Sequence, residues 1–299
     1  MLKTRLLTGV VLAPLIVAVV LLGEPWLSLM IGVAAFLAFV ELVALLDAAG
    51  YEPPQVLTIV AGMTLAAAGL ISANGEGVGG ILTTLLTALD PPGLVAAALV
   101  AVVLLMAAAA FTRGDPRAGF VTWAMSSFGV AYVGLLLPMI VLVAHLGPAG
   151  GSWTTQVGVL GLRSGAAWAI TLVLVVWGYD IGAYLTGRLI GRRRLLDHIS
   201  PSKTIEGLAG GLVLATVAAG IGAALIGLEP WHPLVIGPLV GLSAQVGDLA
   251  ESMLKRAAGR KESGFLVPGH GGILDRVDSF LFAAPVLAGY ALLVAGRVV

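Results

Sequence analysis

The stretch from Pro268 to Asp278, PGHGGILDRVD, joins a glycine-rich loop to two carboxylates in a chain that has few charges elsewhere. Asp275 and Asp278 stand three residues apart, so a helix that begins near Gly272 places both on one face. Two carboxylates at this spacing repel each other unless a cation lies between them, and oxygen ligands favour Mg²⁺ over zinc. The glycine backbone can point N–H groups at an anion, and His270 suits a structural or a functional role equally.

A second polar cluster lies just upstream, in GDLAESMLKR at residues 247–256. Four of its residues fall at positions i, i+3, i+4 and i+7 and would form one stripe on a helix: Asp248, Glu251, Ser252 and Lys255. Because the stripe directly continues an apolar run, we expect it to line a wet cavity at the membrane surface. The alternative is a solvated helix face, stabilised by Asp248–Ser252 and Glu251–Lys255 pairs.

A third cluster begins at residue 177, where Asp180 follows an apolar run and Tyr184 lies one turn later on the same helix face. A carboxylate at membrane depth usually faces a cavity, a partner or an ion. The alternative for Asp180 is a hydrogen bond to a neighbouring helix. The arginines at 192–194 suit a simple membrane-surface anchor.

The same cluster continues with SPSKT at residues 200–204, which joins hydroxyls and Lys203 to a helix start. Free backbone N–H groups at a helix amino terminus attract phosphate, as does a lysine. The alternative is an ordinary N-cap by Ser202 or Thr204, with Glu206 favourable to the helix dipole.

The three clusters supply ligands for a hard metal ion, cations for phosphates and glycine-rich backbone. Nothing in them resembles a serine or cysteine nucleophile held by a base. Phosphoryl or nucleotidyl transfer needs these groups, because the enzyme has to position the substrates and neutralise phosphate charge but supplies no protein nucleophile.

The elements that position these residues are predicted to be membrane helices. Hydrophobic residues make up 59% of the 299 residues, charged residues only 11%, and the mean hydropathy is +1.05. This composition indicates a bilayer as the solvent. The absence of cysteine excludes disulfides and thiolate metal sites, and a net charge of zero gives no general attraction to nucleic acid.

Nine apolar runs approach or exceed the length of about 20 residues that spans a bilayer, and the first is too long for a cleaved signal peptide. They are 6–23, 26–46, 56–73, 93–111, 120–146, 166–190, 208–228, 233–246 and 273–295. The sequence therefore predicts an all-α, polytopic membrane protein. The fifth run is long enough to require a tilt or a break at Gly134 or Pro138, and the eighth is short.

A cytoplasmic amino terminus leaves only Arg163 and Arg297 of the 16 basic residues on the outside, so the positive-inside rule favours this orientation. We interpret residues 1–299 as one membrane domain. Residues 1–165 are expected to form apolar helices, and residues 166–299 are expected to form the catalytic half that carries the polar motifs. Glu41 and Asp47, at the end of the second run, could line the same cavity, but we interpret them as boundary residues.

Several motifs resemble the signature of phosphatidate cytidylyltransferases, also called CDP-diacylglycerol synthases. The signature runs about 27 residues with fixed spacing: SMLKR at 252–256, Lys261, PGHGG at 268–272 and DRVD at 275–278. The upstream segments 180–184 and 200–211 are also similar to that family. Glu262 stands where the family usually has Asp, and Val267 where it has Leu, Ile or Phe.

The resemblance implies that CTP and phosphatidic acid react to give CDP-diacylglycerol and pyrophosphate at the cytoplasmic face of a bacterial inner membrane. It also implies Mg²⁺ held by Asp248, Asp275 and Asp278, a second, monovalent cation such as K⁺ nearby, and a homodimer. We expect Lys255 to act with these acids in catalysis. Membrane lipids are expected as further partners. The residues expected to bind the substrates are Asp180, Tyr184, Ser200, Ser202, Lys203, Ser252, Arg256, Lys261, His270, Gly271 and Arg276.

Two other interpretations stay open at this point. An ion-coupled transporter would also use an intramembrane Asp180 and glycine-broken helices, although its site would lie near the midplane rather than at one surface. A related cytidylyltransferase that acts on an isoprenoid-ether lipid phosphate has the same chemistry, and a polyprenol kinase matches the signature poorly.

Overall fold

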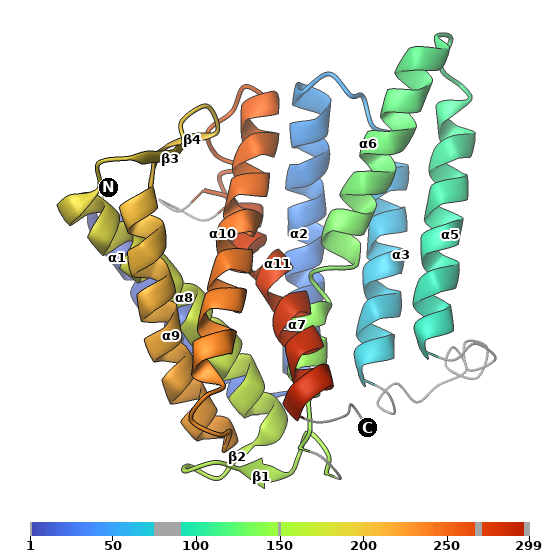
Figure 1. Ribbon diagram of the computed structural model, residues 1–299. Coiled ribbons are helices and arrows are strands. Elements are labelled where there is room, and N and C mark those ends of the chain that lie inside the picture. Colours follow the sequence, from blue (N-terminus) through green and yellow to red (C-terminus); the bar gives the residue numbers. More distant parts are fainter. Residues whose placement is uncertain (1, 75–90, 149–150, 267–270, 296–299) are drawn as a thin grey trace. The chain divides into compact units, whose positions relative to one another are not determined.

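The computed structural model describes residues 2–74, 91–148, 151–266 and 271–295, and helices make up most of these ranges (Figure 1). Within them, eight helices are long and apolar enough to cross a membrane. They coincide with the second to ninth predicted runs, which confirms the all-α polytopic class. The first predicted run lies in helix α1 (Leu2–Leu22), whose side chains are described from Val10 onward.

The chain forms two compact units that interleave along the sequence. Unit 1 comprises residues 1–10, 27–142 and 254–276, and unit 2 comprises residues 11–26, 143–253 and 277–299. Helices α10 (Pro233–Ala257) and α11 (Leu274–Tyr290) contribute to both units. The predicted division into an apolar half, 1–165, and a catalytic half, 166–299, is based on where the polar motifs lie in the sequence. It stays a prediction.

Unit 1 is built of apolar helices: α2 (Trp26–Ala48), α3 (Gln55–Asn74), α5 (Pro91–Ala110) and α6 (Pro116–Gly134). Helices α3, α5 and α6 lie side by side (Figure 1), around a core that contains Leu65, Met106 and Val130. The Asp115 carboxylate accepts backbone N–H groups of the first turn of α6. This N-cap and the proline that follows it explain why the helix begins there.

The fifth predicted run is broken at the predicted place. Helix α6 ends at Gly134, and the short helix α7 (Met139–Val143) begins after Pro138. Proline has no N–H to donate within a helix, which disrupts the hydrogen-bond ladder. Gly134 packs so closely on α3 that an added Cβ would lie 3.1 Å from the carbonyl oxygen of Gly62.

Unit 2 is centred on a close pair of helices, α8 (Ser164–Ile190) and α9 (Ile205–Ile226). Two small antiparallel hairpins, which the sequence did not predict, flank α8. Strands β1 (Gln156–Val157) and β2 (Leu162–Arg163) precede it, and strands β3 (Arg194–Leu196) and β4 (Ser200–Thr204) follow it. The hairpins therefore lie at opposite ends of α8 (Figure 1).

Register within the hairpins is set by the pairs Gln156–Arg163 and Val157–Leu162 in the first, and Arg194–Thr204 and Leu196–Ser200 in the second. At the N-cap position of α9, the Thr204 hydroxyl accepts the N–H of Gly207 at 3.0 Å. The predicted N-cap interpretation of Thr204 is thereby confirmed.

Arg163, one of the two exceptions to the predicted charge distribution, has a local structural role in unit 2. Its guanidinium donates to the carbonyl oxygen of Leu21 in the last turn of α1 and lies 5.9 Å from the centre of the Trp153 ring. A cation at a helix carboxyl terminus satisfies carbonyl groups that have no partner within the helix.

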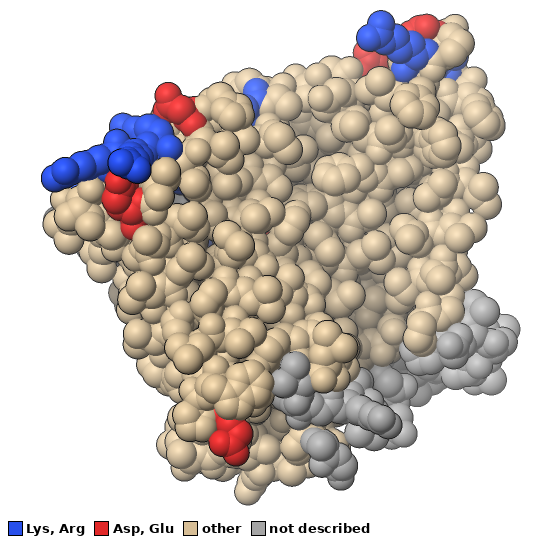
Figure 2. Space-filling view, viewed as in Figure 1, with Lys and Arg blue, Asp and Glu red and all other residues tan. Residues whose placement is uncertain are grey.

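Charged side chains of unit 2 gather at the end that carries β3 and β4. Arg192, Arg193 and Arg194 are exposed there, and Figure 2 shows blue and red atoms together over this hairpin. The helices that lead away from the hairpin are covered by uncharged atoms (Figure 2). Unit 2 thus has one polar, basic end and an apolar flank.

Candidate active site

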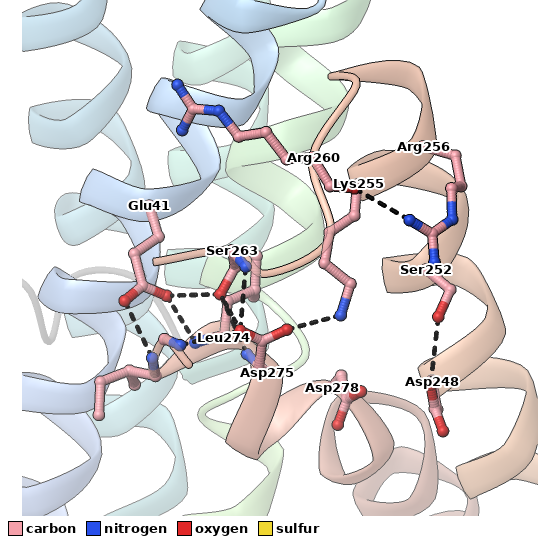
Figure 3. Close-up of polar contacts among 12 residues, drawn as sticks. Glu41, Asp248, Ser252, Lys255, Arg256, Arg260, Ser263, Leu274, Asp275 and Asp278 are labelled. Carbon is pink, nitrogen blue, oxygen red and sulfur yellow. Dashed lines mark hydrogen bonds and ion pairs between the residues drawn. The ribbon is translucent and has the colours of Figure 1, made fainter. Parts of the chain in front are cut away.

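In unit 2, three of the predicted site residues come together from two elements. Strand β4 carries Lys203, whose Nζ lies 2.7 Å from Oδ2 of Asp248 on α10. The Ser252 hydroxyl, one turn further along α10, is 3.4 Å from the other oxygen of Asp248 (Figure 3). The lysine and aspartate side chains are 17% and 35% exposed. The partly buried pair is therefore only partly screened by solvent.

The eighth predicted run is longer than expected, because α10 continues to Ala257 and includes the whole predicted polar stripe. Glu251 is fully buried and Ser252 is 8% exposed. The alternative of a solvated helix face is therefore wrong for these two residues, although the Asp248–Ser252 contact that it predicted is present. In addition, Gln245 on α10 accepts a hydrogen bond of 2.6 Å from Tyr179 on α8, which ties these helices together.

Asp278 also belongs to unit 2, on α11. A Cβ added at Gly247 would collide with the carbonyl oxygen of Asp278, so α10 and α11 touch at this point. The glycine permits the contact, and the next residue on α10 is Asp248. The Asp278 carboxylate accepts the backbone N–H of Ser279 at 2.7 Å, and the residue is 9% exposed.

In unit 1, Asp275 forms the centre of a second polar cluster (Figure 3). Its Oδ1 lies 2.5 Å from Nζ of Lys255. Its Oδ2 accepts the N–H and the hydroxyl of Ser263, at 2.9 and 2.8 Å, and the N–H of Gly272 at 2.8 Å. Through the contact with Gly272, a carboxylate in the first turn of α11 reaches back to the main chain two residues before the helix and helps to fix where α11 begins.

Glu41 joins the same cluster, although the sequence interpretation assigned it to the membrane boundary. That interpretation is wrong: Glu41 is 5% exposed and accepts hydrogen bonds from the N–H groups of Ile273 and Leu274, at 2.9 and 2.8 Å. The Ser263 hydroxyl lies 3.0 Å from its Oε2. One signal in the sequence could have identified it, since a carboxylate inside an apolar run is expensive and usually functional.

The predicted Mg²⁺ set draws on both units, with Asp248 and Asp278 in unit 2 and Asp275 in unit 1. Among the residues that the structure describes, no three His, Asp or Glu side chains form a metal-binding group. The oxygen donors fit a hard cation, since Asp248 and Asp275 each already stabilise a positive charge, that of a lysine. Magnesium and the monovalent cation stay predictions.

The sequence profile of the Cytidylyltransferase family matches residues 3–294. The chain belongs to this family. Among curated relatives, the phosphatidate cytidylyltransferase of Bacillus subtilis (strain 168) is 49% identical over 116 residues, 38% of this chain and 43% of that protein. The phosphatidate cytidylyltransferase of Synechocystis is 46% identical over 120 residues, 40% of this chain and 41% of that protein.

An Escherichia coli (strain K12) protein named uncharacterized protein YnbB is 40% identical over 136 residues, 45% of this chain and 46% of that protein. This cytidylyltransferase chain thus spans less than half the length of the curated relatives that it matches. The family match itself covers nearly the whole chain and confirms the resemblance that the signature motifs predicted.

The other predicted substrate contacts of this cytidylyltransferase differ in their exposure. Ser200 is buried, whereas Asp180, Ser202, Lys261 and Arg276 are exposed. Tyr184 is 60% exposed, and its hydroxyl accepts a hydrogen bond of 2.6 Å from Arg188. Arg256 donates to the carbonyl oxygen of Arg260 at 3.2 Å. Gly271 has a φ of +82°, a conformation that favours glycine, and His270 lies outside the described residues.

Proposed function

We propose that this protein is a phosphatidate cytidylyltransferase, which transfers CMP from CTP to phosphatidic acid and releases pyrophosphate. The observation that carries the proposal is the pair of lysine–aspartate contacts, Lys203–Asp248 and Lys255–Asp275, in a polytopic chain of the cytidylyltransferase family. Two of the curated relatives bear the name phosphatidate cytidylyltransferase.

The reaction needs no protein nucleophile. A phosphate oxygen of phosphatidic acid attacks the α-phosphorus of CTP, a new P–O bond forms, and the bond between the α-phosphorus and the bridging oxygen breaks. The electron pair leaves with pyrophosphate. The protein has to align two anions and neutralise their mutual repulsion.

The lysines of the two clusters are suited to this task. Lys203 and Lys255 are held in place by carboxylates, and a substrate phosphate offers each ammonium a second anionic partner. Further cations lie near in sequence, at Arg256, Lys261 and Arg276. When bound, Mg²⁺ would neutralise phosphate charge, with Asp248, Asp275 and Asp278 as its proposed ligands.

The substrates also determine where the chemistry takes place. Phosphatidic acid stays in the bilayer and CTP stays in water, so the phosphates must meet at a membrane surface. The basic β3–β4 end of unit 2 supports such a site, and we propose that it faces the cytoplasm. A homodimer in the bacterial inner membrane remains a prediction from the family resemblance.

The test is to incubate the purified protein with CTP labelled at the α-phosphate, phosphatidic acid and Mg²⁺, with and without a chelator. We expect label in a lipid that migrates as CDP-diacylglycerol, and its loss with the chelator. Label that forms only with an isoprenoid-ether lipid phosphate would change the assigned lipid substrate. Absence of labelled lipid with either acceptor, together with ion-driven uptake into vesicles, would overturn the proposal in favour of a transporter.

A further inference from the structure

Glu41 is a buried carboxylate in α2, a helix whose residues are mostly apolar. Its side chain reaches the start of α11, where Ile273 donates an N–H to Oε1 and Leu274 donates an N–H to Oε2. These N–H groups have no carbonyl partner within the helix, and a negative charge beside them is favourable. The carboxylate therefore acts as a cap supplied by a helix more than 200 residues earlier in the chain.

The backbone around Glu41 is shaped to the carboxylate. A Cβ added at Gly264 would lie 2.5 Å from Oε1 of Glu41, and a Cβ added at Gly272 would collide with Oε2. A side chain at either position would displace the Glu41 carboxylate, because the main chain approaches it so closely. The segment before α11 is thus folded around the Glu41 side chain.

Ser263 connects this carboxylate to Asp275. Its hydroxyl lies 3.0 Å from Glu41 Oε2 and 2.8 Å from Asp275 Oδ2 (Figure 3). Asp275 Oδ2 also accepts two backbone N–H groups, so its position follows that of the main chain at Ser263 and Gly272. That leaves Oδ1 directed at Nζ of Lys255. A displacement of Glu41 would be transmitted through the serine and the two glycines.

We propose that Glu41 is a positioning residue for nucleotidyl transfer, which fixes Asp275 and, through it, Lys255. The inference rests on the proposed function and adds to it a residue from the first, apolar half of the chain. Glu41→Gln keeps the size of the side chain but turns an amide N–H₂ towards backbone N–H donors. The two ends of this contact then repel, and the start of α11 loses its fixed position.

The kinetic test compares Glu41→Gln with Asp47→Asn, which removes an exposed carboxylate from the same helix. Loss of an interaction that orients reacting groups typically costs about 10- to 100-fold in activity. We expect a kcat reduced by that factor in Glu41→Gln with little change in the KM for CTP, and wild-type values in Asp47→Asn. A kcat equal to that of the wild type in Glu41→Gln would overturn the inference.

A second readout does not depend on turnover. Acylation of lysines by an amine-reactive reagent, followed by peptide mass spectrometry, reports how well each ammonium is held. In Glu41→Gln we expect Lys255 to react faster, while Lys203, paired with Asp248 in the other unit, reacts as in the wild type. Unchanged acylation of Lys255 contradicts the proposal, and so does an equal increase at both lysines, which indicates general unfolding.

Ser263→Ala keeps the inference testable if Glu41→Gln does not fold. It removes only the hydroxyl bridge, so it should lower kcat and speed the acylation of Lys255 as Glu41→Gln does. Ser263→Thr keeps a hydroxyl and should therefore show the wild-type kcat and the wild-type acylation of Lys255. Ser263→Ala with wild-type kcat and wild-type Lys255 acylation would contradict the inference. An inactive wild-type protein would instead refute the proposed function, so the two failures are distinguishable.

Discussion

The two lysines of the clusters, Lys203 and Lys255, are each paired with an aspartate at 2.7 and 2.5 Å. At the edge of a membrane, an ammonium or a carboxylate without a partner is costly, since water cannot fully solvate it. Pairing holds both charges in a defined place. The lysine is therefore already oriented when a phosphate binds. The aspartate can then stabilise the cation that binds with the nucleotide.

Replacement of a single signature acid tests this interpretation at the residue scale. We expect Asp248→Asn and Asp278→Asn each to lower the initial rate of lipid labelling by about 100-fold or more, because charge stabilisation in the transition state is lost. Glu229→Gln, which removes an exposed acid from the α9–α10 connection, should keep wild-type rates. Near-wild-type turnover of either aspartate variant, with an unchanged melting temperature, would show that its carboxylate has no part in the reaction.

At the scale of elements, small residues let α8 and α9 approach closely. Gly182 on α8 faces the Gly210 carbonyl oxygen on α9 so directly that an added Cβ would lie 2.5 Å from it. Lipid tails are as apolar as the helix surfaces, so the hydrophobic effect does little to join helices in a bilayer. Close packing of backbones therefore has to supply much of the attraction. Because β4 lies between α8 and α9 in the chain, the pairing of these helices sets where Lys203 lies.

Two glycines of α9 give a matched test of this packing. In Gly211→Ala the new Cβ would lie 2.7 Å from the buried Tyr179 ring, whose hydroxyl is also bonded to Gln245, so the ring cannot easily move. We expect a loss of about 1–3 kcal/mol in the free energy of unfolding. In Gly220→Ala the Cβ enters open space, and the better helix former should stabilise the protein by up to about 1 kcal/mol.

Unfolding of both variants in the same detergent, followed by circular dichroism, measures these differences. Equal stability of the two variants would mean that α8 and α9 do not pack as closely as their glycines indicate.

At the scale of the whole molecule, the exposed apolar residues indicate which surfaces meet lipid. Along α9, Val213, Val217 and Ile221 are each more than half exposed and recur every four residues, so they form one stripe on the helix. In water such a stripe would be unfavourable, but in a bilayer it is the expected outer face. Helix α8, with 27 residues, is about 40 Å long, enough to cross the hydrocarbon core with a tilt.

The absence of cysteine makes the predicted orientation directly measurable. Two single-cysteine variants test it, one for each hairpin of unit 2. Leu160→Cys lies between β1 and β2 and His198→Cys lies between β3 and β4, both at exposed positions. With the basic β3–β4 end in the cytoplasm, a membrane-impermeant maleimide should label Leu160→Cys in intact cells and His198→Cys only after permeabilisation. The reverse pattern would place the proposed site on the outside of the membrane and remove its access to CTP.

The sequence by itself determined the membrane class, the second to ninth spans, the break near Pro138 and the family. These features depend on runs of similar residues or on fixed spacings along the chain. Such local patterns are visible in the sequence without knowledge of the tertiary structure. The N-cap at Thr204 belongs to the same group, because a cap acts within one turn of its helix.

Only the tertiary structure decided which charges meet. Lys203 pairs with an acid 45 residues away in the chain, and Glu41 meets Ser263 across 222 residues. No periodicity encodes such contacts, because they depend on which helices pack together and on the glycines that let their backbones approach. In a poorly solvated interior a carboxylate must find donors wherever the fold provides them, and for Glu41 these are at the opposite end of the sequence.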